Sequence, residues 1–133
     1  MRKTALFVSL VLMGTLAISG CPRTAPINNP HAVISVSKNL TQAQVREAIY
    51  AACPQRGWEA RDISSNTIEA KVVVRGKHTA VVEIVYSSKD YTIRYKSSDN
   101  LRAEGGSIHS NYNKWVDNLR RDIDTELARI ASK

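Results

Sequence analysis

Cysteine and histidine are scarce in this chain of 133 residues, which has two of the first and three of the second. Cys21 and Cys53 lie far apart, so the chain has no redox motif of two neighbouring thiols. The histidines are scattered and lack the spacing of metal ligands; they are His31, His78 and His109. The sequence therefore predicts neither a metal centre nor a redox centre, and we expect no cofactor.

Catalytic motifs are also lacking. No serine lies in the pattern of a nucleophile elbow, no pair of carboxylates stands out, and no glycine-rich phosphate loop follows a strand. The chain has no internal repeat. These absences predict a protein that is not an enzyme.

A long apolar run opens the sequence. Arg2 and Lys3 precede it, residues 5–18 are almost wholly apolar, and Ser19 and Gly20 are small. This order is typical of a secretory signal peptide, which we assign to residues 1–20. The run is shorter than the about 20 residues of a membrane-spanning helix. A short N-terminal anchor that stays uncleaved is the alternative.

The end of this segment resembles the lipobox of bacterial lipoproteins, because Ile18-Ser19-Gly20-Cys21 is a branched apolar residue, two small residues and a cysteine. The resemblance implies that the Cys21 thiol takes a diacylglycerol, that the signal is cut before Cys21, and that the new amino group is acylated with a fatty acid such as palmitate. The protein would then be lipid-anchored in a bacterial cell envelope, with its domain facing the periplasm. Position 22 is proline and not aspartate, and by the same resemblance the outer membrane is expected.

Acidic residues are in the minority, with 12 Asp and Glu against 19 Lys and Arg. The formal charge of +7 falls to +5 when Arg2 and Lys3 leave with the signal peptide. An exported protein does not meet nucleic acid, so this charge favours anionic envelope partners such as lipid head groups, lipopolysaccharide phosphates or peptidoglycan carboxylates. A charge that is spread over the surface and only aids solubility is the alternative.

Three of the four prolines lie in residues 21–31, CPRTAPINNPH, which show no apolar periodicity. We predict a semi-extended tether here, starting at the lipidated Cys21 and reaching about 30 Å at about 3.1 Å per residue. Such a tether would let the folded domain, residues 32–133, stand off the membrane surface.

Two segments predict amphipathic helices. In the first, Thr41 caps the helix, Gln44 completes a capping box, and Pro54 ends it. The second begins near Ser110 and runs for about twenty residues. The apolar faces are Val45, Ala48, Ile49 and Ala52 in the first, and Tyr112, Trp115, Leu119, Ile123, Leu127 and Ile130 in the second.

Strands rich in Val, Ile, Thr and Tyr lie between the helices, joined by short polar turns, and a further strand is expected over residues 32–37. The residues expected to face inward are Ile68, Ala70, Val72 and Val74; Ala80, Val82, Ile84 and Tyr86; and Tyr91, Ile93 and Tyr95. The predicted fold class is α+β, a two-layer domain in which an antiparallel sheet of four to five strands carries both helices on one face.

One candidate site is the outer face of this sheet. It would combine exposed valines with the cations Lys71, Arg75, Arg94 and Lys96, and could contact an anionic ligand. An ordinary solvated face, with valines selected for strand propensity, is the alternative.

The other candidate is the segment IHSNYNKWVDNL, residues 108–119. His109, Tyr112 and Trp115 could form a partner or aromatic surface for a sugar or a peptide. The alternative is a helix start in which Ser110 is the cap and both rings pack in the core.

The segments IRYKSSDNL and IHSNYNKWVDNL together resemble the C-terminal half of small uncharacterised proteobacterial lipoproteins, over most of residues 57–125. The resemblance implies a compact α+β envelope lipoprotein and brings no catalytic or binding residues with it. We therefore expect a non-enzymatic binding or assembly accessory module, with Cys53 as a buried, inert thiol. A binder of lipopolysaccharide or peptidoglycan through the basic sheet face is the alternative.

Overall fold

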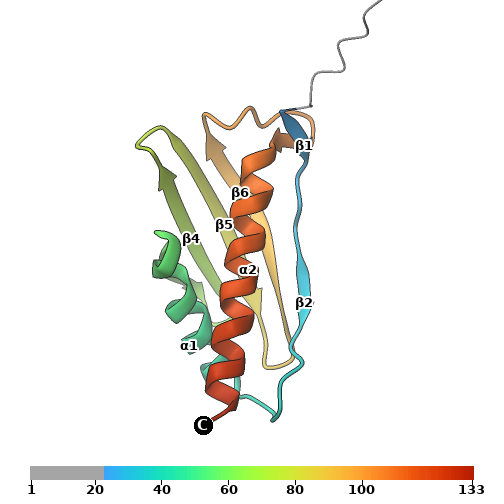
Figure 1. The fold of residues 1–133 in the computed structure, drawn as a ribbon, viewed down its shortest axis with the longest axis vertical. Coiled ribbons are helices and arrows are strands. Elements are labelled where there is room, and N and C mark those ends of the chain that lie inside the picture. The colour runs from blue at the N-terminus through green and yellow to red at the C-terminus, as the bar shows by residue number, and fades with distance from the viewer. Residues whose placement is uncertain (1–22) are drawn as a thin grey trace, which may run out of the picture.

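The structure, a computed structural model, describes residues 23–133. Its elements are β1 (Thr24–Pro26), β2 (His31–Val33), α1 (Gln42–Ala52), the 3-10 helix η1 (Cys53–Arg56), β3 (Glu59–Ser64), β4 (Thr67–Val74), β5 (His78–Tyr86), β6 (Asp90–Asp99), β7 (Ser107–His109) and α2 (Ser110–Ala131). Both helices lie on one face of an antiparallel sheet of order β2-β6-β5-β4-β3, and β1 pairs with β7 separately (Figure 1). The predicted α+β class is confirmed.

Helix α1 begins and ends as its sequence predicts. The Gln44 amide donates to Thr41 Oγ1 at 3.1 Å, and the Thr41 amide donates to Gln44 Oε1 at 2.9 Å, so both halves of the capping box form. Pro54 falls in η1, which follows the helix, and Gly57 then reverses the chain with a φ of 83°. This reversal leads directly into β3.

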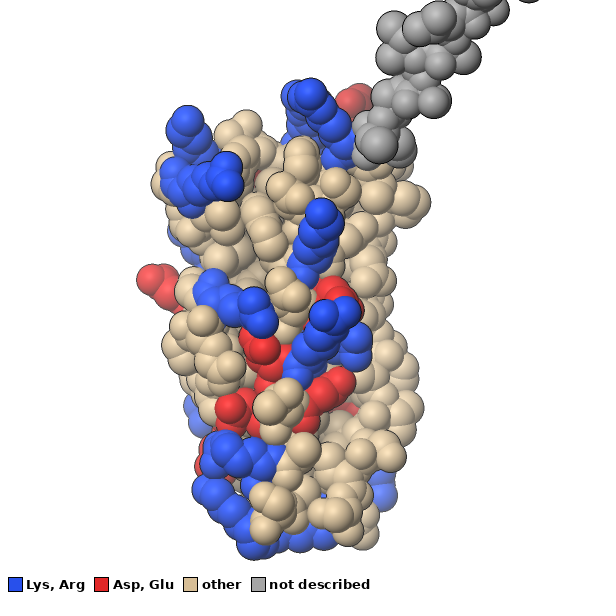
Figure 2. All heavy atoms as spheres, in the orientation of Figure 1, with Lys and Arg blue, Asp and Glu red and all other residues tan. Residues whose placement is uncertain are grey.

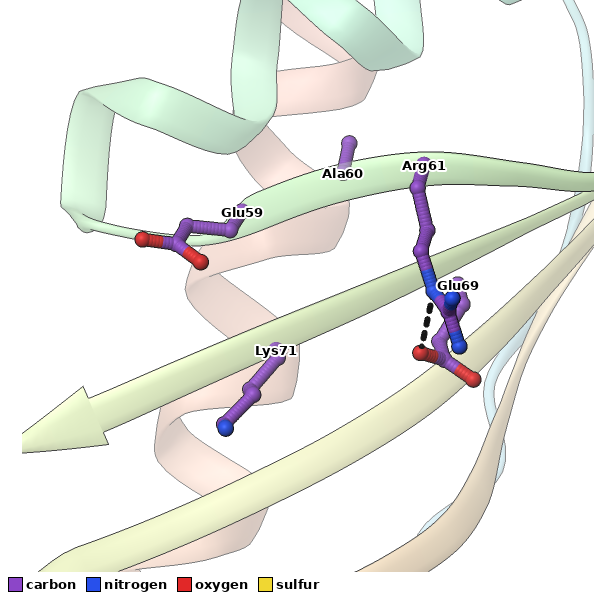
Figure 3. A pocket seen from close by; sticks show the side chains of 5 residues that line it. All are labelled: Glu59, Ala60, Arg61, Glu69 and Lys71. Carbon is purple, nitrogen blue, oxygen red and sulfur yellow. Dashed lines mark hydrogen bonds and ion pairs between the residues drawn. The ribbon is translucent and has the colours of Figure 1, made fainter.

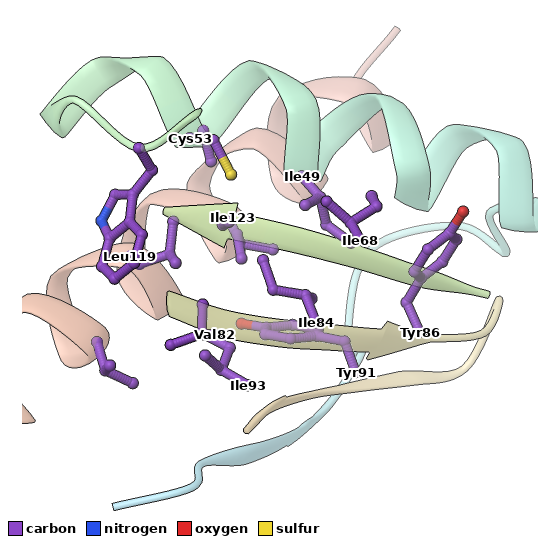
Figure 4. Packing of buried hydrophobic residues seen from close by; sticks show 14 of the residues in the cluster. Ile49, Cys53, Ile68, Val82, Ile84, Tyr86, Tyr91, Ile93, Leu119 and Ile123 are labelled. Carbon is purple, nitrogen blue, oxygen red and sulfur yellow. The ribbon is translucent and has the colours of Figure 1, made fainter. Parts of the chain in front are cut away.

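The hairpins β4–β5 and β5–β6 bring the predicted inward faces into register. Ile84 lies opposite Ile68 on one side and Ile93 on the other, and all three are fully buried (Figure 4). The other predicted inward residues are buried too, except that Val74 and Tyr95 are half-buried at the margin of the core. The alternation of apolar and polar residues therefore predicted the buried face of the sheet correctly.

The strand β6 is longer than expected and contains a bulge. Val82 pairs with Tyr95 and Val81 with Ser97, so Lys96 is the extra residue. The strand continues to Asp99 and β7 begins at Ser107, although the polar, glycine-rich composition of residues 97–107, SSDNLRAEGGS, is typical of a loop.

The N-terminal segment, expected as a free tether, is packed on the domain from Arg23 onward. The strand β1 pairs with β7, and β2 pairs with β6. Between them the Ile93 amide donates to the Pro30 carbonyl at 3.0 Å. The tether prediction is corrected because a proline at a sheet edge can still accept through its carbonyl, although it cannot donate. Cys21 itself lies outside the described residues.

Helix α2 fixes this segment at its other side. Asn113 Nδ2 donates to the Pro26 carbonyl at 2.9 Å, and Asn113 Oδ1 accepts from the Asn28 amide at 3.0 Å. Residues 23–33 therefore form a strap that covers the edge of β6 and ties it to the start of α2. A covered edge cannot pair with another chain.

The core fills the space between the sheet and the helices. Cys53 is fully buried within it, and burial raises the pKa of its thiol to about 12 (Figure 4). The predicted burial of Cys53 is confirmed, and a buried thiol with a raised pKa is expected to be a poor nucleophile. No helix within residues 23–133 has the length and apolar character to span a membrane.

Candidate functional site

The four cations predicted on the outer sheet face do not form one basic patch. Lys96 Nζ lies 2.7 Å from Glu69 Oε2 and 3.5 Å from Glu83 Oε1, while Arg94 lies 3.4 Å from Glu83. Lys71 has no ion pair among the residues described, and Arg75 lies beyond β4 in the turn to β5. The face is thus a mixed network of both signs.

Glu69 is the centre of that network. Arg61 Nε lies 2.9 Å from its other oxygen (Figure 3). Together with Lys96, the carboxylate therefore accepts from two cations. Hydrogen bonds from Arg61 first and then Lys96 lower the pKa of Glu69 to about 2. Glu69 therefore stays ionised down to low pH, and its ion pairs stabilise the outer face. A carboxyl group with so low a pKa does not act as a general acid.

This low pKa predicts acid-sensitive folding. A folded-state pKa of about 2 lies below the ordinary 4.5, so the stability from Glu69 is complete above pH 4.5 and is lost as the pH falls toward 2. The variant Glu69→Gln should melt at a lower temperature than wild type at pH 7 and show a flatter melting curve against pH between 5 and 2. Glu47→Gln, whose carboxyl is exposed and forms no ion pair among the described residues, should leave that slope unchanged. Equal slopes for wild type and Glu69→Gln would contradict the assignment.

A shallow hollow of about 330 Å³ lies beside this network, at the open edge formed by β3 and β4 (Figure 3). Its lining is Glu59, Ala60, Arg61, Glu69 and Lys71. Charges of opposite sign alternate around it, and the pKa of Glu69, one of its two carboxyl groups, is lowered and not raised. The hollow therefore offers no surface of one sign, and Glu69 is held in its ionised form.

The second candidate group, His109, Tyr112 and Trp115, is split between three environments. His109, rather than the predicted Ser110, caps α2, because its Nδ1 accepts from the Asn111 amide at 3.2 Å. Tyr112 is fully buried against Tyr95, with the two rings edge to face at 5.6 Å. Only Trp115, which is half-buried, reaches a surface hollow.

Trp115 is one wall of a cleft of about 220 Å³, which we call the aromatic cleft. Its lining is Arg56, Trp58, Val72, Val74, Trp115 and Asn118. Helix α1 stops short of the β4–β5 turn, whereas α2 runs the length of the sheet, so α1 does not cover the end of β4 (Figure 1). Both tryptophans of the chain meet at this place.

Local backbone structure holds the other walls. Gly57 turns the chain and the Trp58 amide donates to the Cys53 carbonyl at 3.0 Å, which leaves Trp58 only 3% exposed. Arg56 Nε lies 2.7 Å from Asp122 Oδ2 on α2. The cleft therefore has four apolar walls and two polar side chains at its rim, Arg56 and Asn118.

Trp58 and Arg56 were not identified from the sequence, and Asn118 was included only as part of the candidate segment 108–119. Trp58 lies between the first predicted helix and the predicted strands, and no motif connects it with Trp115. The pair Gly57-Trp58, at the junction between a predicted helix and a predicted strand, was the sequence feature that could have indicated a special role for Trp58.

Within residues 23–133, no group of three or more His, Cys, Asp and Glu side chains is arranged to hold a metal ion. No family model, curated protein or solved structure matches the chain.

Proposed function

We propose that this protein is a lipid-anchored, non-enzymatic binding module of the bacterial envelope, attached through Cys21. We propose further that the aromatic cleft takes an apolar side chain from a segment of a partner protein. The observation that carries the proposal is the meeting of both tryptophans, from distant parts of the chain, at one surface hollow.

The size and lining of the cleft favour a protein partner. Pockets for small molecules and cofactors usually measure about 300–1,000 Å³, and this cleft is smaller. Tryptophan is among the residues that most often dominate binding energy at protein interfaces. One amide and one guanidinium at the rim, the latter already paired with Asp122, suit the carbonyl groups of a peptide.

A glycan is less well supported as the occupant. Sugars present many hydroxyl groups, and two valine side chains in the lining cannot satisfy them. The alternative of an anionic ligand on Lys71, Arg75, Arg94 and Lys96 is also weaker than the sequence suggested. Glu69 and Glu83 already neutralise Arg94 and Lys96.

Photo-crosslinking in living cells tests the cleft. A photoreactive residue at Asn118, on the rim, should give a discrete adduct with an envelope protein. The same residue at Val73, which is 52% exposed on the outer sheet face, is the matched control and should give none.

The second variant makes the result specific. Adding Trp115→Ala should weaken the adduct from position 118 at least about 30-fold, the effect of losing an interface hot spot. Adding Val81→Ala on the outer face should leave it unchanged. Adducts from position 73 but not 118 would contradict the cleft and favour the sheet face.

A further inference from the structure

The chain leaves the domain at one end, beside the start of α2. The Ser110 amide donates to the Arg23 carbonyl at 2.9 Å, and β1 continues from there against β7. Two peptide bonds separate Arg23 from Cys21, so their Cα atoms are at most about 7–8 Å apart. A lipid on Cys21 would therefore enter the membrane next to this end of the fold.

Exposed cations gather at the same end. Arg75 and Lys77 lie in the β4–β5 turn and Arg102 in the β6–β7 connection, and each is exposed, as is Arg23. Within the described part of the chain these four side chains make no ion pair. Figure 2 shows Lys and Arg side chains at this end and also at the opposite end, with most of the acidic side chains between the two ends beside basic ones.

Hydrogen bonds join the loops of this end into one surface. His78 Nδ1 lies 2.8 Å from the Asn100 carbonyl, and Asn100 Nδ2 donates to the Lys77 carbonyl at 3.3 Å. The His109 amide donates to the Leu101 carbonyl at 2.7 Å. The cations are therefore presented together, although they come from separate parts of the sequence.

Two of the arginines have a backbone conformation that arginine rarely adopts. Arg75 has a φ of 56° beside Gly76 at 64°, and Arg102 has a φ of 54°. Asn, Asp and Gly are the usual residues in this left-handed region. The backbone conformation therefore does not account for arginine at either position.

We propose that this end of the domain, defined by Arg23, Arg75, Lys77 and Arg102 and called the basic end, docks on the anionic lipid head groups of the leaflet that holds Cys21. The inference rests on the proposed lipid anchor. Asp99 and Glu104 are the acidic residues of this end and leave it with a positive excess. Lipid phosphates complement that excess.

Docking at the basic end sets the orientation of the whole domain. Helix α2 starts there, and its 22 residues extend about 33 Å away from the membrane. Val74, in the aromatic cleft, directly precedes Arg75, so the cleft lies beside the membrane. The partner segment would then be one that lies close to the bilayer surface.

Vesicle binding without the lipid tests this docking. The mature chain, residues 21–133 with Cys21→Ser, is mixed with vesicles of phosphatidylethanolamine and phosphatidylglycerol at a ratio of about 3:1, and with neutral phosphatidylcholine vesicles. Each Lys or Arg near an anionic surface adds roughly fivefold to partitioning. The variant Arg75→Asp, Lys77→Asp and Arg102→Asp should therefore lose about 100-fold or more on the anionic vesicles.

The substitutions are chosen so that a folding defect does not imitate the result. Aspartate followed by Gly76 is a preferred pair for this turn, so the variant should melt no lower than wild type. The control variant Lys38→Asp, Lys89→Asp and Lys133→Asp has the same change in charge, away from the basic end, and should keep most of the binding. Equal binding to both vesicle types, or equal losses in both variants, would overturn the docking. Neither result would bear on the proposed lipid anchor or the proposed binding role of the aromatic cleft, because separate experiments test these.

Discussion

Replacing Ile123 with alanine is expected to lower the free energy of unfolding by about 3 kcal/mol, within the usual range of 2–5 kcal/mol for a buried Ile→Ala change. Ile123 lies on the sheet side of α2 and has no exposed surface (Figure 4). The truncation removes apolar surface from the core and leaves a cavity that two packed layers cannot readily close. A loss of this size is a large part of the 5–15 kcal/mol that stabilises a typical domain.

The control for this variant has the same chemistry at an exposed site. Ile63 on the edge strand β3 is 45% exposed, and Ile63→Ala should cost less than about 0.5 kcal/mol. Urea unfolding of both variants in the mature chain with Cys21→Ser measures the difference. Similar costs at the two positions would mean that the core does not lie between α2 and the sheet.

Replacing Cys21 with serine is expected to abolish membrane anchoring. A serine hydroxyl is far less nucleophilic than a thiol at neutral pH, so no thioether to diacylglycerol can form and the precursor should keep residues 1–20. Several acyl chains hold a protein firmly, whereas a single chain binds only marginally. The wild-type protein should therefore fractionate almost wholly with membranes in its mature form, and the variant should accumulate as an unlipidated precursor.

The other cysteine supplies the control. Cys53→Ala should leave lipidation unchanged, because the Cys53 side chain is fully buried and no enzyme can reach its thiol in the folded domain. A Cys21→Ser variant that still gives a lipidated, mature protein would refute the attachment site.

The helices and the sheet face could be predicted because their causes are local. Thr41 and Gln44 lie three residues apart and complete each other's hydrogen bonds within one turn. Alternation along β4 and β5 places Ile68 and Ile84 on one face whatever the rest of the chain does. Short polar turns then determine which strands are neighbours.

The strap could not be predicted because its causes are distant in the sequence. Asn113 binds the Pro26 carbonyl, and nothing in the local sequence of either residue indicates the other. A proline-rich segment with no apolar periodicity has the same appearance whether it is free or lies along a sheet edge. If Cys21 carries the proposed lipid, the packed strap would hold the domain beside the membrane, whereas a free tether would let it stand off.

The residues of the candidate sites could be predicted where they follow from strand or helix periodicity, and could not where they depend on contacts between distant segments. Glu69 and Glu83 were recognisable on the outer face from the same alternation as the cations, but their pairing with Lys96 depends on register and on a bulge at that residue. Trp115 was recognised as a candidate, whereas its partner Trp58 was not. The aromatic cleft lies where the shorter helix α1 does not extend alongside α2. A difference in helix length leaves no sequence motif that would indicate a binding site.

The most direct test of the account is the intact mass of the wild-type protein purified from membranes. The expected chain begins at Cys21 and carries the added mass of a diacylglycerol and one further acyl group. Fragmentation should place that mass on Cys21 and leave Cys53 unmodified. A mass equal to the unmodified full chain, or to a mature chain without lipid, would contradict the anchor and with it the orientation proposed for the domain.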